Sequence, residues 1–361
     1  MNKRLVSLAV ALLLSGCGGS AAPASAPAAP ASAPSSPSSA AVTRPSGSAA
    51  PAGASAPSNA GAKPAASAGQ LKQIKIATPI VGSAFSYLYA ARDLGLFKAH
   101  GLDAQIIAMP PANAVAALQS GDLDYAATVG SVIRSALKGI PERVVTIAAN
   151  RPNFVILGAK GTTSIDQLKG KVVAVDAAGS TSYVMLTELL KRKGLASGSY
   201  QTVAANSDEA RALLVENGQA TACILDVSNG LRLQAEGYPL LAQVADFPEA
   251  PFSGLGAATS AIQKNRPLLE AGLQATLEGV AAMRNRKAEV VPIMAKALNI
   301  SQDQESAVYD AMKDVWTTDG KASDAANDFE FTNDQQALEL KTKPTADQVY
   351  DFSMLDEVNK K

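Results

Sequence analysis

Residues 171–194 read KVVAVDAAGSTSYVMLTELLKRKG and contain one complete unit of the fold. The β-branched run from Val172 to Val175 predicts a buried strand, and a small polar turn follows it. Ser180 is the type of residue that starts a helix, and Gly194 is the type that ends one. The stretch therefore predicts a strand, a polar turn, a helix and a glycine stop.

The same unit recurs three more times. The other expected strands are 74–77, 125–128 and 222–225, and their helices are expected to stop at Gly95, Gly139 and Gly237. Short strands that alternate with helices indicate an α/β fold with mostly parallel sheets. A helix, a glycine and a strand also follow one another at 112–128 and at 207–225, which favours two related lobes. Chance is the alternative, because this order is frequent in α/β proteins.

The polar turns predict where a ligand binds. They leave unpaired backbone N–H groups at helix N-termini, beside the carboxyl ends of the strands, where open α/β sheets hold their ligands. Two turns from each lobe are therefore expected to face one cleft.

Residues 1–17 predict a secretory signal. A charged start is followed by an apolar run over 5–14, which is too short to span a bilayer as a mature helix. The run ends in Leu14-Ser15-Gly16-Cys17, which resembles the lipobox of bacterial lipoproteins and implies cleavage before Cys17 and acylation of that cysteine. The alternative is an ordinary signal peptide with an incidental cysteine.

Residues 18–70 consist almost entirely of Ala, Pro, Ser and Gly. Such a segment cannot offset its ordering entropy by burial, so a disordered tether is predicted. The folding unit that follows has about 290 residues, which suits two lobes.

The charges and the reactive side chains exclude several functions. The chain has 32 basic and 32 acidic residues, so it lacks the electrostatic footprint of a nucleic-acid-binding protein. Once Cys17 is acylated only Cys223 remains, and its apolar strand predicts a buried thiol and no intrachain disulfide. The single histidine, His100, is expected to be an exposed turn residue. No catalytic residue, metal site or cofactor is therefore expected.

Capping-box patterns predict further helix starts at Ser164, Ser301 and Thr345. Apolar residues at 349, 352, 355 and 358 predict one packed C-terminal helix.

Three motifs carry a family resemblance. They are AARDLGLFKAHGLD at 90–103, AALQSGDLDYA at 116–126 and SIDQLKGKV at 164–172. In this order they resemble the signatures of the nitrate, sulfonate, taurine and thiamine-precursor binding proteins of ABC importers. The resemblance implies a type II periplasmic-binding-protein fold, with two α/β lobes joined by a two-strand hinge. It implies 71–157 plus 252–361 as lobe one and 158–251 as lobe two. The short apolar stretches 154–157 and 252–258 predict the two hinge strands between them.

By position, the resemblance implies the ligand contacts Gly82, Ser83, Phe85, Gly130, Ser131, Gly179, Ser180, Thr181 and the loop at Asp226. The first loop departs from the pattern. It carries Pro79-Ile80-Val81 where sulfonate binders often have extra polar or basic residues, which argues against a sulfonate.

Each candidate also has an ordinary structural explanation. Ser83, Ser131, Ser180 and Thr181 are candidate helix caps, and Asp226 is either a cap or an acceptor for a ligand N–H. Phe85 and Tyr183 are candidates to stack an aromatic ligand, or are core residues. Arg151 is a candidate partner for a ligand carboxylate, or part of an ion pair.

The resemblance therefore implies an extracytoplasmic solute-binding lipoprotein, a monomer held to the membrane by its lipid alone. It would capture a small organic solute, such as an aromatic carboxylate, a sulfonate or a pyrimidine-like compound, and deliver it to an ABC permease and its ATPase. A sensor or scaffolding lipoprotein is the alternative. An enzyme is a weaker one, since a desulfinase and a pyrimidine synthase of this fold rely on cysteine or histidine chemistry that is lacking here.

Overall fold

A computed structural model describes residues 70–178 and 180–360 of the chain. The expected signal peptide, Cys17 and the tether therefore lie outside the described residues, as does Gly179.

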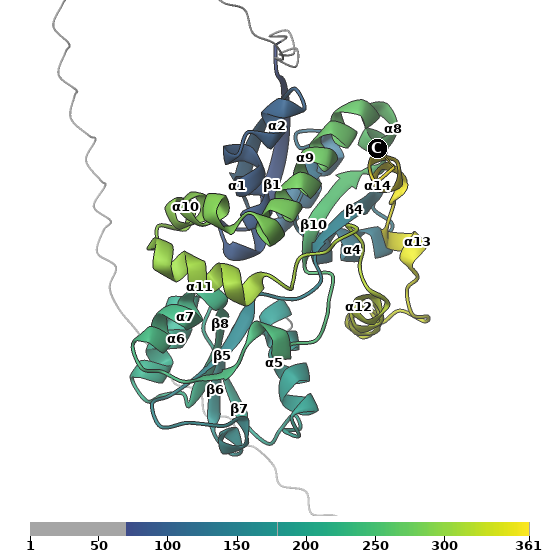
Figure 1. The fold of residues 1–361 in the computed structure, drawn as a ribbon. Helices are drawn as coiled ribbons and strands as arrows, with labels where there is room; N and C mark the ends of the chain where they lie inside the picture. Colours follow the sequence, from purple (N-terminus) through teal and green to yellow (C-terminus); the bar gives the residue numbers. More distant parts are fainter. Residues whose placement is uncertain (1–69, 179, 361) are drawn as a thin grey trace, which may run out of the picture. The chain divides into compact units, whose positions relative to one another are not determined.

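The first sheet has five strands in the order β2-β1-β3-β10-β4. Strands β1, β10 and β4 of this sheet are labelled in Figure 1. Their bounds are Lys72–Thr78 (β1), Leu102–Ala108 (β2), Tyr125–Ala126 (β3), Glu142–Ala149 (β4) and Ser253–Ala258 (β10). β1 pairs in parallel with β2 and β3, whereas β10 runs antiparallel between β3 and β4.

The second sheet repeats this plan in the order β7-β6-β8-β5-β9. Its strands are Phe154–Gly158 (β5), Val172–Val175 (β6), Gln201–Ala204 (β7), Ala222–Asp226 (β8) and Leu240–Ala242 (β9). β6 pairs in parallel with β7 and β8, and β5 runs antiparallel between β8 and β9. We call each sheet with its covering helices a lobe; the expected α/β fold with two related lobes is confirmed.

Helices cover both faces of the first sheet. The helices beside it are α1 (Ser86–Asp93), α2 (Leu96–Ala99), α3 (Pro111–Ser120), α4 (Val129–Leu137), α8 (Thr259–Lys264), α9 (Arg266–Asn285), α10 (Lys287–Leu298), α13 (Ala346–Val349) and α14 (Ser353–Val358), with a short 3-10 turn η1 (Ser83–Phe85). Successive strand residues point to opposite faces, so Ile76 packs with α1 and α9, whereas Ala77 packs with α3 and α4.

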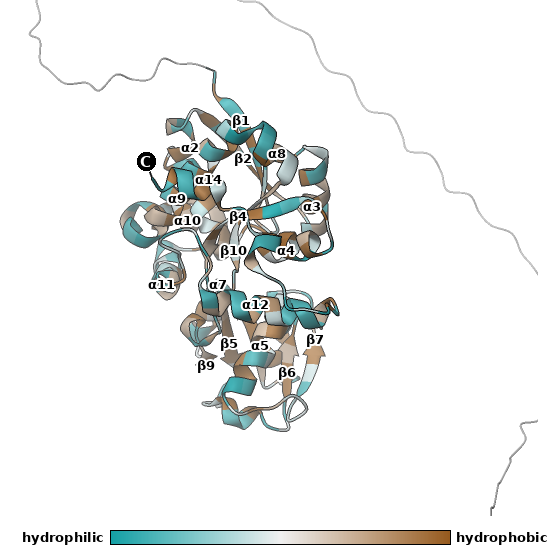
Figure 2. Ribbon diagram, turned by 90° about the vertical axis from the view of Figure 1, so that its right-hand side faces the viewer, coloured by the Kyte–Doolittle hydropathy of each residue, from teal (hydrophilic) through white to brown (hydrophobic). Residues whose placement is uncertain are grey.

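The second sheet is also covered on both faces. α5 (Thr181–Arg192) packs its leucines on one face, while α6 (Asp208–Glu216) and α7 (Val227–Ala235) cover the other. Two 3-10 turns, η2 (Ile165–Leu168) and η3 (Val244–Asp246), complete this lobe. Strands β5 and β6 are coloured mostly hydrophobic in Figure 2, as strands buried on both faces require.

The connections between the lobes differ from the expected hinge strands. β5 belongs wholly to the second sheet and β10 to the first, so the chain crosses in the irregular segments 150–153 and 247–252. The two crossings lie side by side, because Ala250 N donates to Asn150 O at 2.9 Å and Phe252 N donates to Ala149 O at 3.0 Å. Residues 154–157, expected in lobe one, thus pair in the second sheet.

The C-terminal third contacts both lobes. α11 (Gln302–Met312) packs against α10 of the first lobe and α7 of the second. From α12 (Asp324–Ala337), Phe329 packs on the core of the second lobe while Phe331 packs on that of the first.

The prediction of a single C-terminal helix from the apolar spacing is wrong, because α13 and α14 are separated at Tyr350 by extended backbone. The capping boxes at Ser164, Ser301 and Thr345 are confirmed.

The contact between α1 and α9 predicts a large cost for one methyl group. A Cβ on Gly279 of α9 would lie 2.3 Å from the Tyr87 carbonyl oxygen and 2.8 Å from Ala91 Cβ. We expect Gly279→Ala to lower the free energy of unfolding by roughly 2 kcal/mol, measured by urea denaturation, although alanine favours a helix. Gly272→Ala, on the same helix, meets first the terminal methyl group of the Ile74 side chain instead of backbone and should cost less. Equal costs would contradict this account.

Candidate functional site

Buried polar groups without hydrogen-bond partners gather along one edge of the first sheet. Thr78 ends β1, Thr128 follows β3, and Ser253 begins the antiparallel β10, so all three reach the same edge. Their hydroxyl oxygens have no partner among the described residues, and Thr78 and Ser253 are fully buried. Such groups are uncommon because each costs its desolvation energy.

Trp316 adds a donor to the same edge. It forms a bridge with Ala149, the last residue of β4, and its ring packs edge-on against Tyr87 with centroids 6.0 Å apart. The Tyr87 hydroxyl donates to Gly254 O at 3.0 Å, whereas the buried indole Nε1–H has no partner in the described part of the chain. We call Thr78, Thr128, Ser253 and Trp316 the polar edge.

The second lobe meets the first beside this edge through Ser83 and Asp226. The Ser83 hydroxyl lies 3.2 Å and 3.3 Å from the two Asp226 carboxylate oxygens. Asn153, in the first crossing segment, donates from Nδ2 to Ser83 Oγ at 2.8 Å and also to the Asp226 carboxylate. We call these three residues the interlobe junction.

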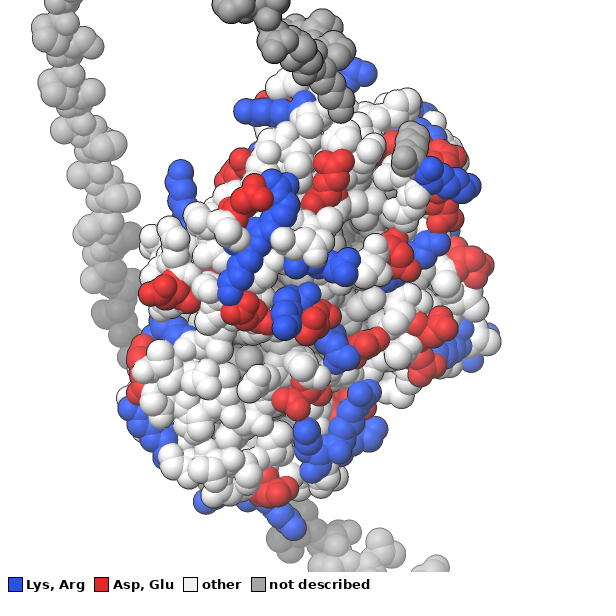
Figure 3. Space-filling model, viewed as in Figure 1, with Lys and Arg blue, Asp and Glu red and all other residues white. Residues whose placement is uncertain are grey.

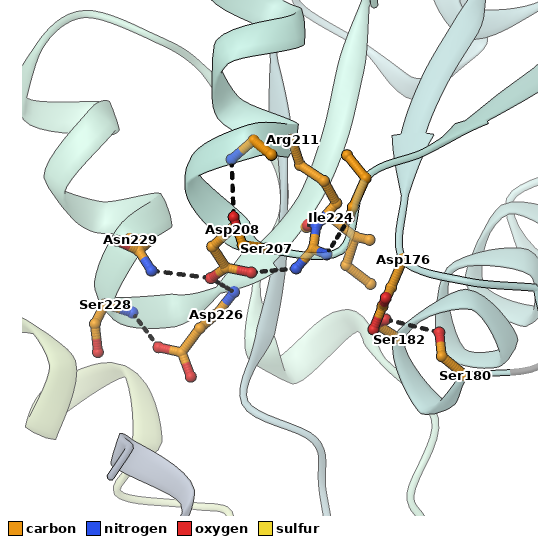
Figure 4. Close-up of polar contacts among 12 residues, drawn as sticks. Asp176, Ser180, Ser182, Ser207, Asp208, Arg211, Ile224, Asp226, Ser228 and Asn229 are labelled. Atoms are coloured by element: carbon orange, nitrogen blue, oxygen red, sulfur yellow. Dashed lines mark hydrogen bonds and ion pairs between the residues drawn. The ribbon is translucent and has the colours of Figure 1, made fainter. Parts of the chain in front are cut away.

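Asp226 is held in place from within the second lobe. It caps α7 by accepting from Ser228 N at 2.8 Å, and its own backbone N–H donates to Asp208 Oδ2 at 2.8 Å (Figure 4). Asp208 also accepts from Asn229 and pairs with the buried guanidinium of Arg211. Arg211 in turn donates to the Ile224 carbonyl oxygen at 2.8 Å. The turn between β8 and α7 is therefore fixed on several sides.

A second carboxylate lies near Asp226. Glu305 of α11 is 1% exposed, and its Oε2 has no hydrogen-bond partner among the residues described. Burial, and then repulsion from Asp226, raise the pKa of Glu305 to about 8. Burial likewise raises the pKa of Asp226 to about 6, although its bond from Ser228 acts in the opposite direction.

The predicted residues of the second lobe lie at the start of α5. Ser180 caps this helix by accepting from Tyr183 N at 3.2 Å, and its hydroxyl lies 3.1 Å from that of Ser182 (Figure 4). Thr181 is exposed, and the half-buried Tyr183 packs against the core of the second lobe.

The predicted residues of the first lobe fall into two groups. Ser83 belongs to the junction, and Gly82 precedes it as the N-cap of η1. Phe85 is 7% exposed and belongs to the hydrophobic core, which matches the alternative that it is a core residue. Gly130 and Ser131, expected in a turn before a helix, lie inside the first turn of α4, because that helix already begins at Val129.

Arg151 is engaged within the protein. Its guanidinium donates to Phe247 O at 2.7 Å and pairs with Glu249 at 3.0 Å, so it ties the two crossing segments together. This is the ion pair that was the alternative to a ligand contact.

The polar edge, Asn153 and Glu305 were missed by sequence reasoning. Thr78, Ser253 and Trp316 become neighbours only through the strand order. Glu305 did carry a signal, because it is the one charged member of the buried stripe that continues at Val308, Tyr309 and Met312. A carboxylate on the apolar face of a helix is rare, because burying it without a partner is costly, and it therefore indicates a functional or structural role.

Cys223 is fully buried, as expected, and burial raises the pKa of its thiol to about 12. This thiol is therefore protonated at neutral pH and is a poor nucleophile. His100 was expected to be exposed but is half-buried, because its ring contacts Glu278 of α9 at 2.8 Å.

Within 70–178 and 180–360, no three His, Cys, Asp or Glu side chains are arranged to hold a metal ion. None of the helices in these ranges has the length and apolar character needed to cross a bilayer. Basic and acidic side chains are interspersed on the face shown in Figure 3.

Residues 83–290, more than half of the chain, match the family described as NMT1/THI5 like. A comparison with curated proteins finds no match.

Several solved structures share the fold. The periplasmic aliphatic sulphonate binding protein SsuA from Escherichia coli is 18% identical, with a TM-score of 0.65 over 79% of this chain and 99% of that one. The ligand binding component of an ABC-type import system from Staphylococcus aureus, with zinc bound, is 18% identical, with a TM-score of 0.64 over 80% and 99%. A mutant of DszB in complex with biphenyl-2-sulfinic acid is 12% identical, with a TM-score of 0.60 over 80% and 99%.

The raised pKa of Glu305 predicts how stability depends on pH. The folded chain keeps a proton that the unfolded chain releases between pH 4.5 and about 8, so the free energy of unfolding falls as the pH rises through this window. Glu305→Gln removes this term. We expect the variant's stability relative to the wild type to increase by about 2 kcal/mol between pH 6 and pH 8, measured by urea denaturation.

Glu289→Gln is the control for this measurement. Its exposed carboxylate is paired with Arg286, which lowers the pKa of Glu289, so it is ionised throughout this pH range. A pH-independent difference between Glu305→Gln and the wild type would show that Glu305 is not protonated in the folded chain.

Proposed function

The chain belongs to the NMT1/THI5-like family, and on that premise we propose that it is the solute-binding subunit of an ABC importer, which captures a small organic molecule between its lobes. The observation that carries the proposal is the polar edge. Four buried hydrogen-bonding groups at one end of the first sheet have no partners among the described residues, and a bound solute would supply them.

The geometry suits a receptor that opens and closes. The lobes are joined by two adjacent irregular segments, which can absorb a change of backbone angle more easily than paired strands. Closure would remove the solute from water, and the closed form would be the one that a permease recognises.

Two of the similar structures support this role through their names, since one is a sulphonate binding protein and the other a component of an import system. DszB shares the fold, so the fold alone does not decide the role. The protonated thiol of Cys223 favours binding over nucleophilic chemistry.

The N-terminal segment extends the proposal to location. A lipid on Cys17 and the tether over 18–70 would hold the lobes outside the cytoplasm, near a membrane permease and its ATPase. The solute classes that the family resemblance leaves open are aromatic carboxylates, sulfonates and pyrimidine-like compounds, although the first loop argues against a sulfonate.

Removing one hydroxyl of the polar edge tests solute binding. The screen measures the melting temperature of residues 71–361 against sulfonates, aromatic carboxylates, pyrimidines and inorganic oxyanions. A compound at a hundred times its Kd stabilises by about 2.7 kcal/mol. Thr78→Val should leave the unliganded chain as stable as before, because the lost hydroxyl has no partner, and should abolish the ligand-induced shift.

Thr146→Val is the matched control, since Thr146 is equally buried on a strand of the same sheet and its hydroxyl donates to Gly320 O at 3.1 Å. This variant should lose about 1 kcal/mol of stability and keep the ligand-induced shift. The absence of any shift across the screen would count against solute binding and favour a sensor or scaffolding lipoprotein.

Cys17→Ser tests the anchor. In the full-length chain, expressed in a bacterium that processes lipoproteins, the wild type should fractionate with membranes and incorporate an alkyne-labelled fatty acid. Cys17→Ser should lose both properties, whereas Cys223→Ser should keep them, because that thiol is buried in β8. Membrane retention of Cys17→Ser with no label would point to a different anchor.

A further inference from the structure

Two carboxylates at the meeting of the lobes have no cationic partner. Asp226 accepts hydrogen bonds from the junction, and Glu305 lies on α11, the helix that packs against α7 directly after Asp226. Neither forms an ion pair within the described part of the chain, although sixteen pairs occur elsewhere in it. Buried carboxylates are normally paired or neutral, because burial without a counter-charge is costly.

Three partly or fully buried arginines of the two lobes are already engaged within the protein. Arg151 pairs with Glu249, and Arg211 pairs with Asp208. Arg134 of α4, the third, lies 3.4 Å and 3.6 Å from two carboxylates of α12. None of the three is available to neutralise an anionic solute without breaking a pair that the protein already makes.

Unpartnered buried atoms point to a missing donor. Glu305 is 1% exposed, and its Oε2 accepts from no described residue. The neutral polar edge contributes further open positions, three of them hydroxyls that can accept as well as donate.

We propose that the solute carries a protonated nitrogen, such as an ammonium or amidinium group, which binds at the carboxylates of Asp226 and Glu305. This inference rests on the proposed solute-binding function and specifies the chemical class of the solute. N–H donors on a cation would satisfy the open acceptors, and the positive charge would replace the proton that Glu305 keeps in the free protein.

The same arrangement disfavours anions. A sulfonate or carboxylate placed at this position would meet the Asp226 carboxylate and no free guanidinium, and would lose its hydration without a counter-charge. The sequence of the first loop also argues against an anionic solute, because this loop carries Pro79-Ile80-Val81 and no basic residue.

A matched series of probes tests the charge class. Butylamine, butyrate and butanesulfonate share one alkyl chain and differ in their head group, as benzamidine, benzamide and benzoate share one ring. We expect the two cations to raise the melting temperature of residues 71–361 and the four other probes to leave it unchanged. A shift with an anion, or the lack of a shift with both cations, overturns the inference.

The variant Glu305→Gln tests the residue. It keeps the volume of the side chain but cannot ionise when a cation binds, so the Kd of the better cationic probe should rise at least about tenfold, measured by calorimetry. Glu289→Gln, on the neighbouring α10, should leave this Kd unchanged. A purely structural Glu305 would change stability but not the Kd, and that result would overturn the assignment.

Failure here is distinguishable from failure of the proposed function. If an anionic or neutral compound binds and loses its effect in Thr78→Val but not in Glu305→Gln, solute binding stands and the cationic class is wrong.

Discussion

The half-buried carboxylate of Asp226 connects the two halves of this protein. It accepts from Ser83 of the first lobe and from Asn153 of the crossing segment, and it caps a helix of its own lobe. A charge with so many partners fixes geometry more than it adds stability, because its desolvation offsets much of what the hydrogen bonds contribute. The position of α7 relative to the first-lobe turn that carries Ser83 therefore depends on Asp226.

The duplicated sheet plan explains why the junction lies where it does. In each lobe two parallel βα units end at the same edge, and one antiparallel strand arrives from the other lobe and inserts beside them. The crossing chain must therefore pass close to the helix N-termini of both lobes. Polar groups that are unsatisfied in one lobe are consequently brought near polar groups of the other, which is the usual place for a ligand in open α/β sheets.

The charges at this site cannot be inferred from the shared fold. Folds of this kind are shared by proteins whose names include sulphonate binding and import, yet identities of 18% carry no information about the ligand. The buried groups at this junction are carboxylates, hydroxyls and an indole, and the nearby arginines are already paired. The recognition chemistry must therefore be derived from the side chains of this chain.

Local pattern in the sequence determined the βα units, the capping boxes and the burial of Cys223, because helix starts, glycine stops and apolar runs act over a few neighbouring residues. The same local pattern predicted only some of the residues that lie at the candidate site. Ser83 and Asp226 lie at the junction, but α4 begins early enough to include Gly130, and Arg151 is paired with Glu249.

Only the tertiary structure decided which groups meet. Thr78, Ser253 and Trp316 are far apart in the chain and become neighbours because β10 returns antiparallel between β3 and β4. Strand order depends on the packing of the whole sheet, so no short pattern records it.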